Sequence, residues 1–268
     1  MAVTSINDDT RAYGREAPFW EAALLQQYTP RTPDVNLGDY VHHYERVESQ
    51  DQLLSTQFRE LIATLMLAVV GHQRFAARHI RRLYRLGVTS QVVVDTFWAA
   101  SPFIGRAHVL SGIRCIHLAN DASNLEGTLP PGGAPTNLTD FAELHLSNSG
   151  PGSQILADTP EWQLVTQLDP RLAELTLGFY EEVMGGSRSW TLPVAARELV
   201  AIVCLAWRGM LDLATDHVRV ALACGVDSRQ VLEALSAAVP MTGLVTLQVG
   251  AQAMIRAQTG DRPQSSNQ

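Results

Sequence analysis

The chain has 268 residues, of which 46% are hydrophobic and 18% charged, and its 20 basic and 27 acidic side chains give a formal net charge of −7. This composition is typical of a folded protein, and the acidic balance argues against nucleic acid as a partner. All the basic residues counted there are arginines, which excludes chemistry that needs a lysine amine, such as a Schiff base or pyridoxal phosphate.

Three features bear on the compartment. Cys115, Cys204 and Cys224 are widely spaced and form no CxxC pair, which indicates a reducing compartment. The N-terminal residues MAVTSINDDTR contain no apolar stretch, so no secretory signal is expected. No continuous apolar run reaches the length of a membrane span. We therefore predict a cytoplasmic protein without a membrane partner.

The sequence repeats itself. A shift of 138 residues aligns residues 59–112 with residues 197–250 without a gap, and 19 of the 54 aligned positions are identical. Self-similarity of this length indicates a tandem duplication. We place the first repeat at residues 17–117 and the second at 159–258. The intervening residues 118–158 are rich in Pro, Gly, Ser and Asn and are expected to be a linker.

Within each repeat the apolar pattern is helical, and an all-α fold is predicted. The expected helices cover residues 58–70, 72–86, 90–100 and 103–117, and in the second repeat residues 196–208, 210–224, 228–238 and 241–257. Gly87 and Gly225 are expected to end the second helices. Thr89 and Asp227 should cap the third helices, and Pro102 and Pro240 should end them. The arginines of residues 72–86 are expected to face solvent: Arg78, Arg81, Arg82 and Arg85.

Each repeat places one Glu on its first helix and one His on its second, nineteen residues later: Glu60 with His79, and Glu198 with His217. Two antiparallel helices joined at a glycine would bring each pair together. A carboxylate that orients an imidazole is a simple general acid–base pair. The alternative is that each pair only satisfies itself in a helical core and keeps two helices in register.

The run RELIATLMLAVVGHQRFAARHIRRLYRLGV and its counterpart RELVAIVCLAWRGMLDLATDHVRVALACGV resemble the carboxymuconolactone decarboxylase and alkylhydroperoxidase D-like superfamily. The resemblance covers most of both repeats and implies an all-helical fold that assembles as trimers or hexamers. In the peroxidase branch, a CxxCxxxH motif supplies a redox dithiol. Here the two cysteine positions hold His72 and Phe75, and Met210 and Leu213, which argues against a dithiol peroxidase. The resemblance therefore points to the decarboxylase branch, which has the Glu and the His without the cysteines and needs no metal or organic cofactor.

The two predicted sites differ in their surroundings. His72 shares a face with His79 and is included with the catalytic residues Glu60, His79, Glu198 and His217. Residues predicted to bind substrate are Arg59, Trp98, His108, Arg197, Trp207 and Asp212, of which Trp98 and Trp207 would wall a pocket for a flat substrate. Three histidines with Glu60 would also suit a metal, although their spacing is not the usual one, and no metal is predicted.

The sequence thus predicts a redox-inactive, cofactor-independent lyase that decarboxylates a small cyclic or polyketide-like acid, as in secondary metabolism, with the first repeat as the working site. An isomerase, cyclase or hydrolase that uses the same pair is the alternative, as is a non-catalytic binding or scaffold protein. The expected partner besides a small-molecule substrate is the chain itself, as a homotrimer resembling a hexamer or as a dimer.

Overall fold

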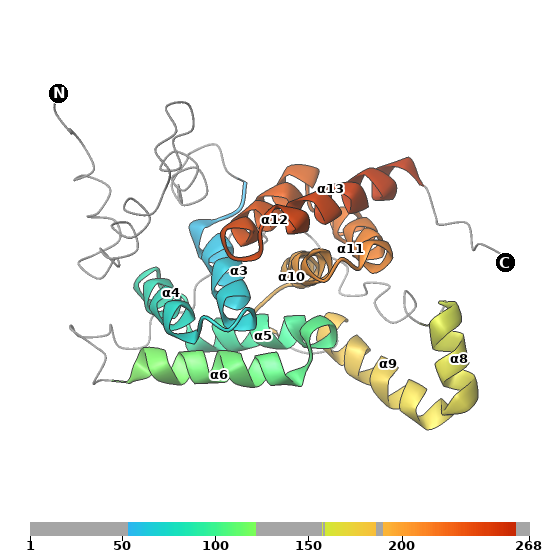
Figure 1. Ribbon diagram of the computed structural model, residues 1–268, viewed down its shortest axis with the longest axis horizontal. Coiled ribbons are helices and arrows are strands. Elements are labelled where there is room, and N and C mark those ends of the chain that lie inside the picture. Colours follow the sequence, from blue (N-terminus) through green and yellow to red (C-terminus); the bar gives the residue numbers. More distant parts are fainter. Residues whose placement is uncertain (1–52, 122–156, 158, 186–189, 261–268) are drawn as a thin grey trace. The chain divides into compact units, whose positions relative to one another are not determined.

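The computed structural model describes residues 53–121, 157, 159–185 and 190–260 (Figure 1). These residues form helices and no strand, which confirms the all-α class. The first set of helices is α3 (Thr56–Val69), α4 (Gln73–Arg85), α5 (Ser90–Ile104) and α6 (Arg106–Asn120). The second set is α8 (Pro160–Leu168), α9 (Pro170–Met184), α10 (Val194–Trp207), α11 (Leu211–Ala223), α12 (Ser228–Thr242) and α13 (Leu244–Thr259).

The predicted boundaries fall partly on these elements. Residues 17–52 of the first predicted repeat and residues 122–156 of the predicted linker lie outside the described residues. Residues 118–120, expected in the linker, are the last turn of α6. The helices α3, α4 and α5 begin 138 residues before α10, α11 and α12, so the sequence offset is also the offset between equivalent helices.

The expected caps of the third helices are confirmed, but their expected ends are wrong. The Thr89 side chain accepts from the backbone N–H of Val92, and Asp227 forms a capping box with Gln230. α5 and α12 continue through Pro102 and Pro240 and end at glycines with φ of 81°. A proline in the last turn removes only one helical hydrogen bond. The carbonyl of Trp98, four residues before Pro102, accepts from the Ser101 hydroxyl instead.

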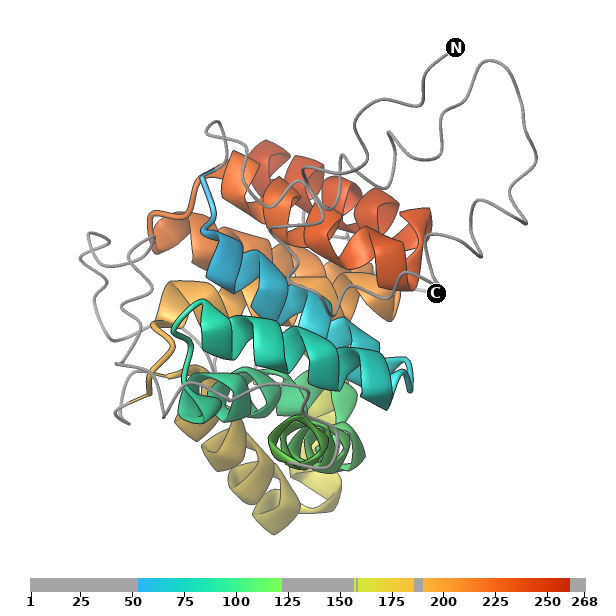
Figure 2. The same cartoon turned by 90° about the vertical axis from the view of Figure 1, so that its left-hand side faces the viewer.

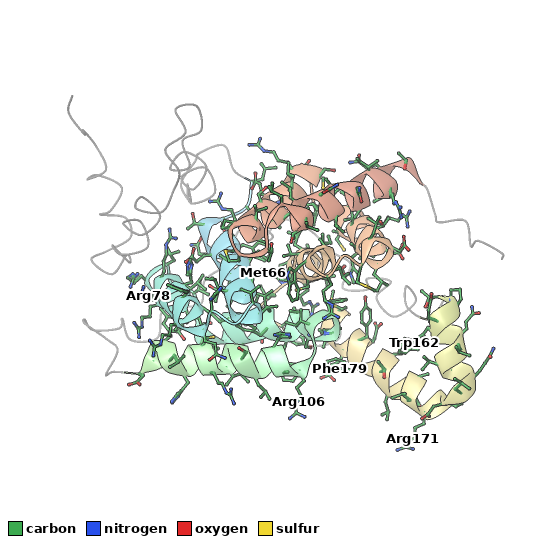
Figure 3. The ribbon with its side chains drawn as sticks, in the orientation of Figure 1. Met66, Arg78, Arg106, Trp162, Arg171 and Phe179 are labelled. Atoms are coloured by element: carbon green, nitrogen blue, oxygen red, sulfur yellow. The ribbon has the colours of Figure 1, made fainter. Side chains whose placement is uncertain are left out.

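The helices form two hairpins, and the first helix of each hairpin packs against the third helix of the other set. α3 packs on α4, and α10 packs on α11. In addition, α3 packs on α12 of the second set, and α10 packs on α5 of the first. Figure 2 shows α3 running between α4 and the helices of the second set. Both sets therefore contribute to one hydrophobic core, in which Met66 of α3 is fully buried (Figure 3).

Two equivalent carboxylates, one in each set, bind the chain just before the first helix of the other set. Glu233 on α12 accepts from the backbone N–H groups of Leu53 and Leu54, just before α3. At the equivalent position, Asp95 on α5 accepts from the N–H and the hydroxyl of Thr191, just before α10. Each acid thus fixes the entry of the other set's first helix, where a negative charge is also favoured by the helix dipole.

Glycines at equivalent positions of the two sets let the last two helices of each set approach closely. A Cβ added to Gly112 on α6 would lie 2.5 Å from the ring of Phe97, and one added to Gly250 on α13 would lie 2.3 Å from Leu235. We expect Gly112→Ala and Gly250→Ala each to lower the free energy of unfolding by about 1–3 kcal/mol through overpacking. Urea denaturation would check this, with Gly178→Ala as control because a Cβ there meets nothing within 4 Å. Equal stability of all three variants would contradict the close packing.

None of the described helices combines the length and apolar character that crossing a membrane requires.

Candidate functional site

The first predicted pair is brought together at the α3–α4 hairpin. The turn between these helices contains Gly71 with φ of 94°, a conformation that favours glycine. The turn sets the two helices so that Glu60 Oε1 lies 2.7 Å from His79 Nδ1. The carboxylate can only accept, so Nδ1 donates and the imidazole presents Nε2 on its other side. His79 Nε2 has no hydrogen-bond partner among the residues that the structure describes.

Arg82, one turn after His79 on α4, completes this cluster. Its Nη1 donates to Glu60 Oε2 at 3.0 Å, so both carboxylate oxygens are bound. Burial by itself would raise the pKa of Glu60, but His79, Arg82 and Arg85 outweigh burial and hold the pKa below its usual range. Glu60 is therefore an ionised, fixed acceptor at neutral pH, and its part is to orient His79.

The lowered pKa of Glu60 predicts a pH dependence of stability. A carboxyl whose pKa is lower in the folded chain stabilises it above the unfolded-state pKa, and this contribution is lost as the pH falls through the folded-state pKa. We expect the unfolding free energies of wild type and Glu60→Gln to differ at neutral pH and to converge below the usual range of glutamate. Urea titrations at a series of pH values would measure this difference. A difference that stays constant with pH would contradict the assignment.

The second predicted pair is also brought together, but in a closed environment. Glu198 on α10 and His217 on α11 are both 1% exposed, and Glu198 Oε2 lies 2.6 Å from His217 Nδ1. The Tyr180 hydroxyl, from α9, lies 2.9 Å from His217 Nε2. Burial and the nearby Glu198 raise the pKa of Tyr180, so its hydroxyl stays protonated and donates to the ring. Phe103 of α5 packs edge-on against both rings.

Exposure separates the two histidines. The His79 side chain is 35% exposed and its Nε2 is free of described partners, whereas both nitrogens of His217 are engaged and the ring is sealed. The first pair has the geometry of an acid–base group that reaches solvent. The second has the geometry of a structural link between α9, α10 and α11.

The other predicted histidines lie apart from this pair. His72 is exposed just before α4, where its ring contacts Phe75, and two helical turns separate it from His79. His108 is half-buried on α6. Within the described part of the chain, no three His, Cys, Asp or Glu side chains form a group that could hold a metal ion. The structure does not bring His72 or His108 to Glu60.

The two arginines predicted to bind substrate, Arg59 and Arg197, differ in burial and in their partners. Arg59 is half-buried on α3, next to Glu60 in sequence. Arg197 is 2% exposed; its Nη2 donates to the carbonyl of Gly185 and its guanidinium lies 5.4 Å from the centre of the Trp190 ring. Burial lowers the pKa of Arg197 to about 10, which leaves it charged at neutral pH. Arg197 is therefore not beside His217 but toward α9.

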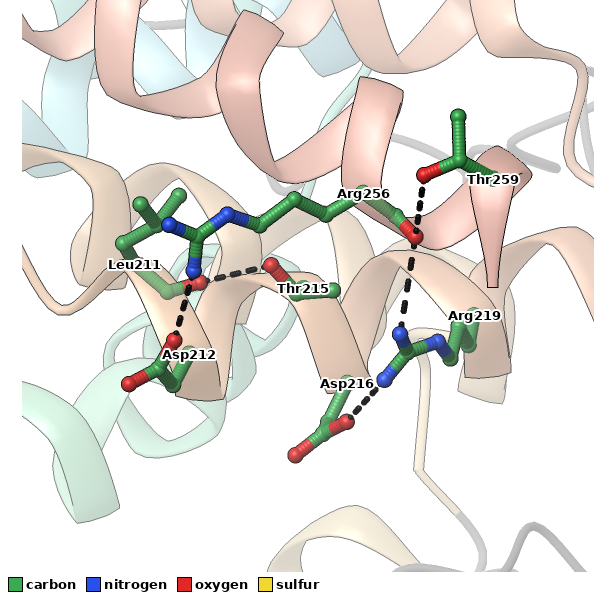
Figure 4. A network of polar contacts seen from close by, with 7 residues as sticks. All are labelled: Leu211, Asp212, Thr215, Asp216, Arg219, Arg256 and Thr259. Carbon is green, nitrogen blue, oxygen red and sulfur yellow. Dashed lines mark hydrogen bonds and ion pairs between the residues drawn. The ribbon is translucent and has the colours of Figure 1, made fainter. Parts of the chain in front are cut away.

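Asp212 and Trp207 do not join the second pair either. Asp212 is exposed and forms an ion pair with Arg256 of α13 at 2.8 Å, beside a second pair between Asp216 and Arg219 (Figure 4). Trp207, the last residue of α10, packs half-buried against the core. Asp212 thus links α11 to α13 at the surface.

Trp98 does line a pocket, although not beside a Glu–His pair. The cavity has a volume of about 480 Å³, and its wall is formed by α5, α9 and the residue Trp190: Gln91, Asp95, Trp98, Phe179, Glu182, Val183 and Trp190. Neither His79 nor His217 is among these residues. The cavity is therefore separate from both pairs.

The cysteines are unsuited to thiolate chemistry. Burial raises the pKa of Cys115 to about 11 and that of Cys204 to about 12, and the pKa of Cys224 is also raised. All three are free thiols. They stay protonated at neutral pH, when a nucleophilic or redox thiol would be ionised.

Sequence reasoning missed two residues of these clusters and misplaced one more. Arg82 and Arg81 do not simply face solvent: Arg82 binds Glu60, and Arg81 is buried, with its guanidinium donating to the carbonyls of Leu118 and Ala119. The signal for Arg82 was its position one turn after His79. Tyr180 precedes the gapless aligned segment, so nothing in the repeat pattern pointed to it.

No protein-family model matches the sequence, and no curated protein matches it either.

Proposed function

We propose that the chain is a cofactor-independent lyase that decarboxylates a small acid, with His79 as the proton donor and Glu60 as the residue that orients it. The observation that carries the proposal is His79 itself, whose Nδ1 is fixed by an ionised, buried carboxylate while its side chain is 35% exposed. This is the arrangement that general acid–base catalysis requires. The resemblance of both repeats to carboxymuconolactone decarboxylases supports the choice of reaction.

The charges around His79 favour an anionic substrate. α4 carries five arginines and no acid, QRFAARHIRRLYR, whereas the equivalent α11, LDLATDHVRVALA, carries two aspartates and one arginine. A positively charged face raises the local concentration of anions. Arg78 directly precedes His79, and Arg85 follows Arg78 by two helical turns, so these two arginines share one face of α4, roughly 100° around the helix from His79. They are candidates to hold a carboxylate.

The reaction follows from these parts. The bond between the carboxylate carbon and its neighbour breaks, carbon dioxide leaves, and the electron pair stays as an enolate on the substrate. Protonated His79 then donates its Nε2 proton to the enolate carbon, and the neutral ring regains a proton from solvent. Glu60, itself ionised, keeps the imidazole in one orientation throughout. The arginines of α4 offset the negative charge that the enolate carries.

A structural role for the second pair accompanies this proposal. His217 has no nitrogen left for a substrate, and Tyr180 and Phe103 close it from two sides. We also propose that the chain self-associates and works in the cytoplasm. Large apolar side chains exposed on α8, α9 and α13 are the surfaces that self-association would use: Leu164, Leu168, Leu172, Leu175, Leu244, Val245 and Ile255.

The test is a panel of small γ-lactone acids and β-keto acids, assayed for carbon dioxide release in deuterated water. The proposal predicts that at least one acid is decarboxylated and that its product carries one deuterium at the carbon that lost the carboxylate. Release of carbon dioxide from none of these acids would overturn the lyase. Deuterium incorporation without carbon dioxide release would favour the isomerase alternative, because the same pair would then only exchange a proton.

A further inference from the structure

The cavity between α5 and α9 contains features that neither Glu–His pair explains. Three aromatic side chains and two carboxylates border it: Trp98, Phe179, Trp190, Asp95 and Glu182 (Figure 3 labels Phe179). No basic side chain is among its lining residues. Its volume of about 480 Å³ lies in the range of small-molecule sites.

Asp95 is a buried carboxylate that makes no direct salt bridge to a described side chain, although its charge acts on the nearby buried guanidinium of Arg197. It is 5% exposed, and its two oxygens accept hydrogen bonds only from neutral groups: the Gln91 amide, and the N–H and hydroxyl of Thr191. Within the described residues it forms no ion pair. A buried charge is ordinarily paired, because desolvation without a partner is costly.

The second set of helices offers a comparison for Asp95. Glu233, equivalent to Asp95, performs the same task at the start of α3 and is paired with Arg229 four residues earlier, at 3.4 Å. The residue equivalent to Arg229 in the first set is Gln91. Asp95 thus lacks the directly paired arginine that Glu233 has on its own helix, and Asp95 is the one that borders the cavity.

The aromatic walls are held in place. Trp190 Nε1 donates to the carbonyl of Glu182 at 3.2 Å, and the guanidinium of Arg197 lies against the same ring from the buried side. Trp98 is half-buried on α5, next to the core, and Phe179 stands on α9. Aromatic faces with a carboxylate between them attract a desolvated cation electrostatically.

We propose that this cavity binds a small organic cation, a quaternary ammonium or a protonated amine, with Asp95 as its counter-ion and Trp98, Phe179 and Trp190 around its alkyl groups. An anionic ligand is disfavoured because both charged lining residues are acidic. Arg197 interacts electrostatically with Asp95 but is not among the lining residues; it is buried, bonded to the Gly185 carbonyl and packed against the Trp190 ring. The site is independent of His79 and stands whether or not the chain is a lyase.

The test compares choline with its neutral isostere 3,3-dimethyl-1-butanol, titrated against the full-length chain and followed by saturation-transfer NMR. Choline is expected to bind at least about tenfold more tightly than the alcohol, since the cation interaction alone exceeds about 1.4 kcal/mol when it is desolvated. Benzoate serves as the anionic comparison. Equal binding of choline and the alcohol, tighter binding of benzoate, or no binding of choline would each overturn the proposal.

The variants test the charge while they leave the hydrogen bonds between Thr191 and Asp95 in place. Gln91→Arg recreates the pairing of Arg229 with Glu233 and should weaken choline binding by about tenfold or more, because the new cation occupies the carboxylate. Arg229→Gln, the reverse change on α12, should leave choline binding unchanged. Trp98→Ala should weaken it as well. If Gln91→Arg or Trp98→Ala binds choline as wild type does, the site is elsewhere and the proposal fails.

Discussion

His79→Gln is expected to lower kcat/KM by about 10²–10⁴-fold, the usual contribution of a general acid or base. Glutamine can still donate to Glu60 but has no ionisable proton for the substrate. The loss should appear in kcat, because the anion-binding arginines of α4 are unchanged. The measurement is steady-state turnover of the acid identified in the panel, with circular dichroism to show that the variant is folded.

The matched control is His217→Gln, assayed on the same acid. The folded fraction of this variant should keep kcat within a few-fold of wild type, because His217 has no nitrogen directed to solvent. Equal losses of kcat in the two variants, or a larger loss in His217→Gln, would show that the closed pair is the working one.

His217→Ala is expected to be the most destabilising change, at about 3–5 kcal/mol. It leaves Glu198 as a buried carboxylate whose imidazole partner is gone and removes the acceptor of Tyr180, with both groups inaccessible to water. His79→Ala should cost only about 0–1 kcal/mol, because its ring is partly exposed and Glu60 keeps Arg82. Urea denaturation of the two variants measures the contrast.

Tyr180→Phe keeps this prediction testable if His217→Ala fails to fold. It removes only the hydroxyl that closes the ring and should cost about 1–3 kcal/mol, the penalty for a buried acceptor left unpaired. Should Tyr180→Phe and His217→Ala both prove as stable as wild type, the buried cluster would not be the structural link that we describe.

The helices were predictable because their signals are local and occur twice. Glycines, capping side chains and apolar stripes recur at an offset of 138, and the Glu–His spacing recurs with them. The predicted ends of α5 and α12 were wrong because a proline in the last turn of a helix is tolerated, and Pro102 and Pro240 both lie in a last turn. The prediction that Arg81 faces solvent was wrong because the buried face of α4 is wider than its apolar residues, and Arg81 lies on that face.

What the sequence did not provide is long-range assembly. Tyr180 reaches His217 from 37 residues away, and Phe103 reaches it from the other set of helices. The cavity likewise joins Trp98 of α5 to Phe179 of α9. The contact of Phe103 and the cavity both depend on the packing of α5 against the second set, and no periodicity along one helix encodes that packing.

The most direct test is mapped modification of the wild-type chain with diethyl pyrocarbonate, which acylates accessible neutral imidazoles. Turnover of the acid and modification of each histidine would be followed together, the latter by mass spectrometry. We predict that activity is lost at the rate at which His79 is acylated, that hydroxylamine restores it, and that His217 stays unmodified while the chain is folded. Full activity with His79 acylated, or rapid acylation of His217, would contradict the assignment of an open and a closed pair.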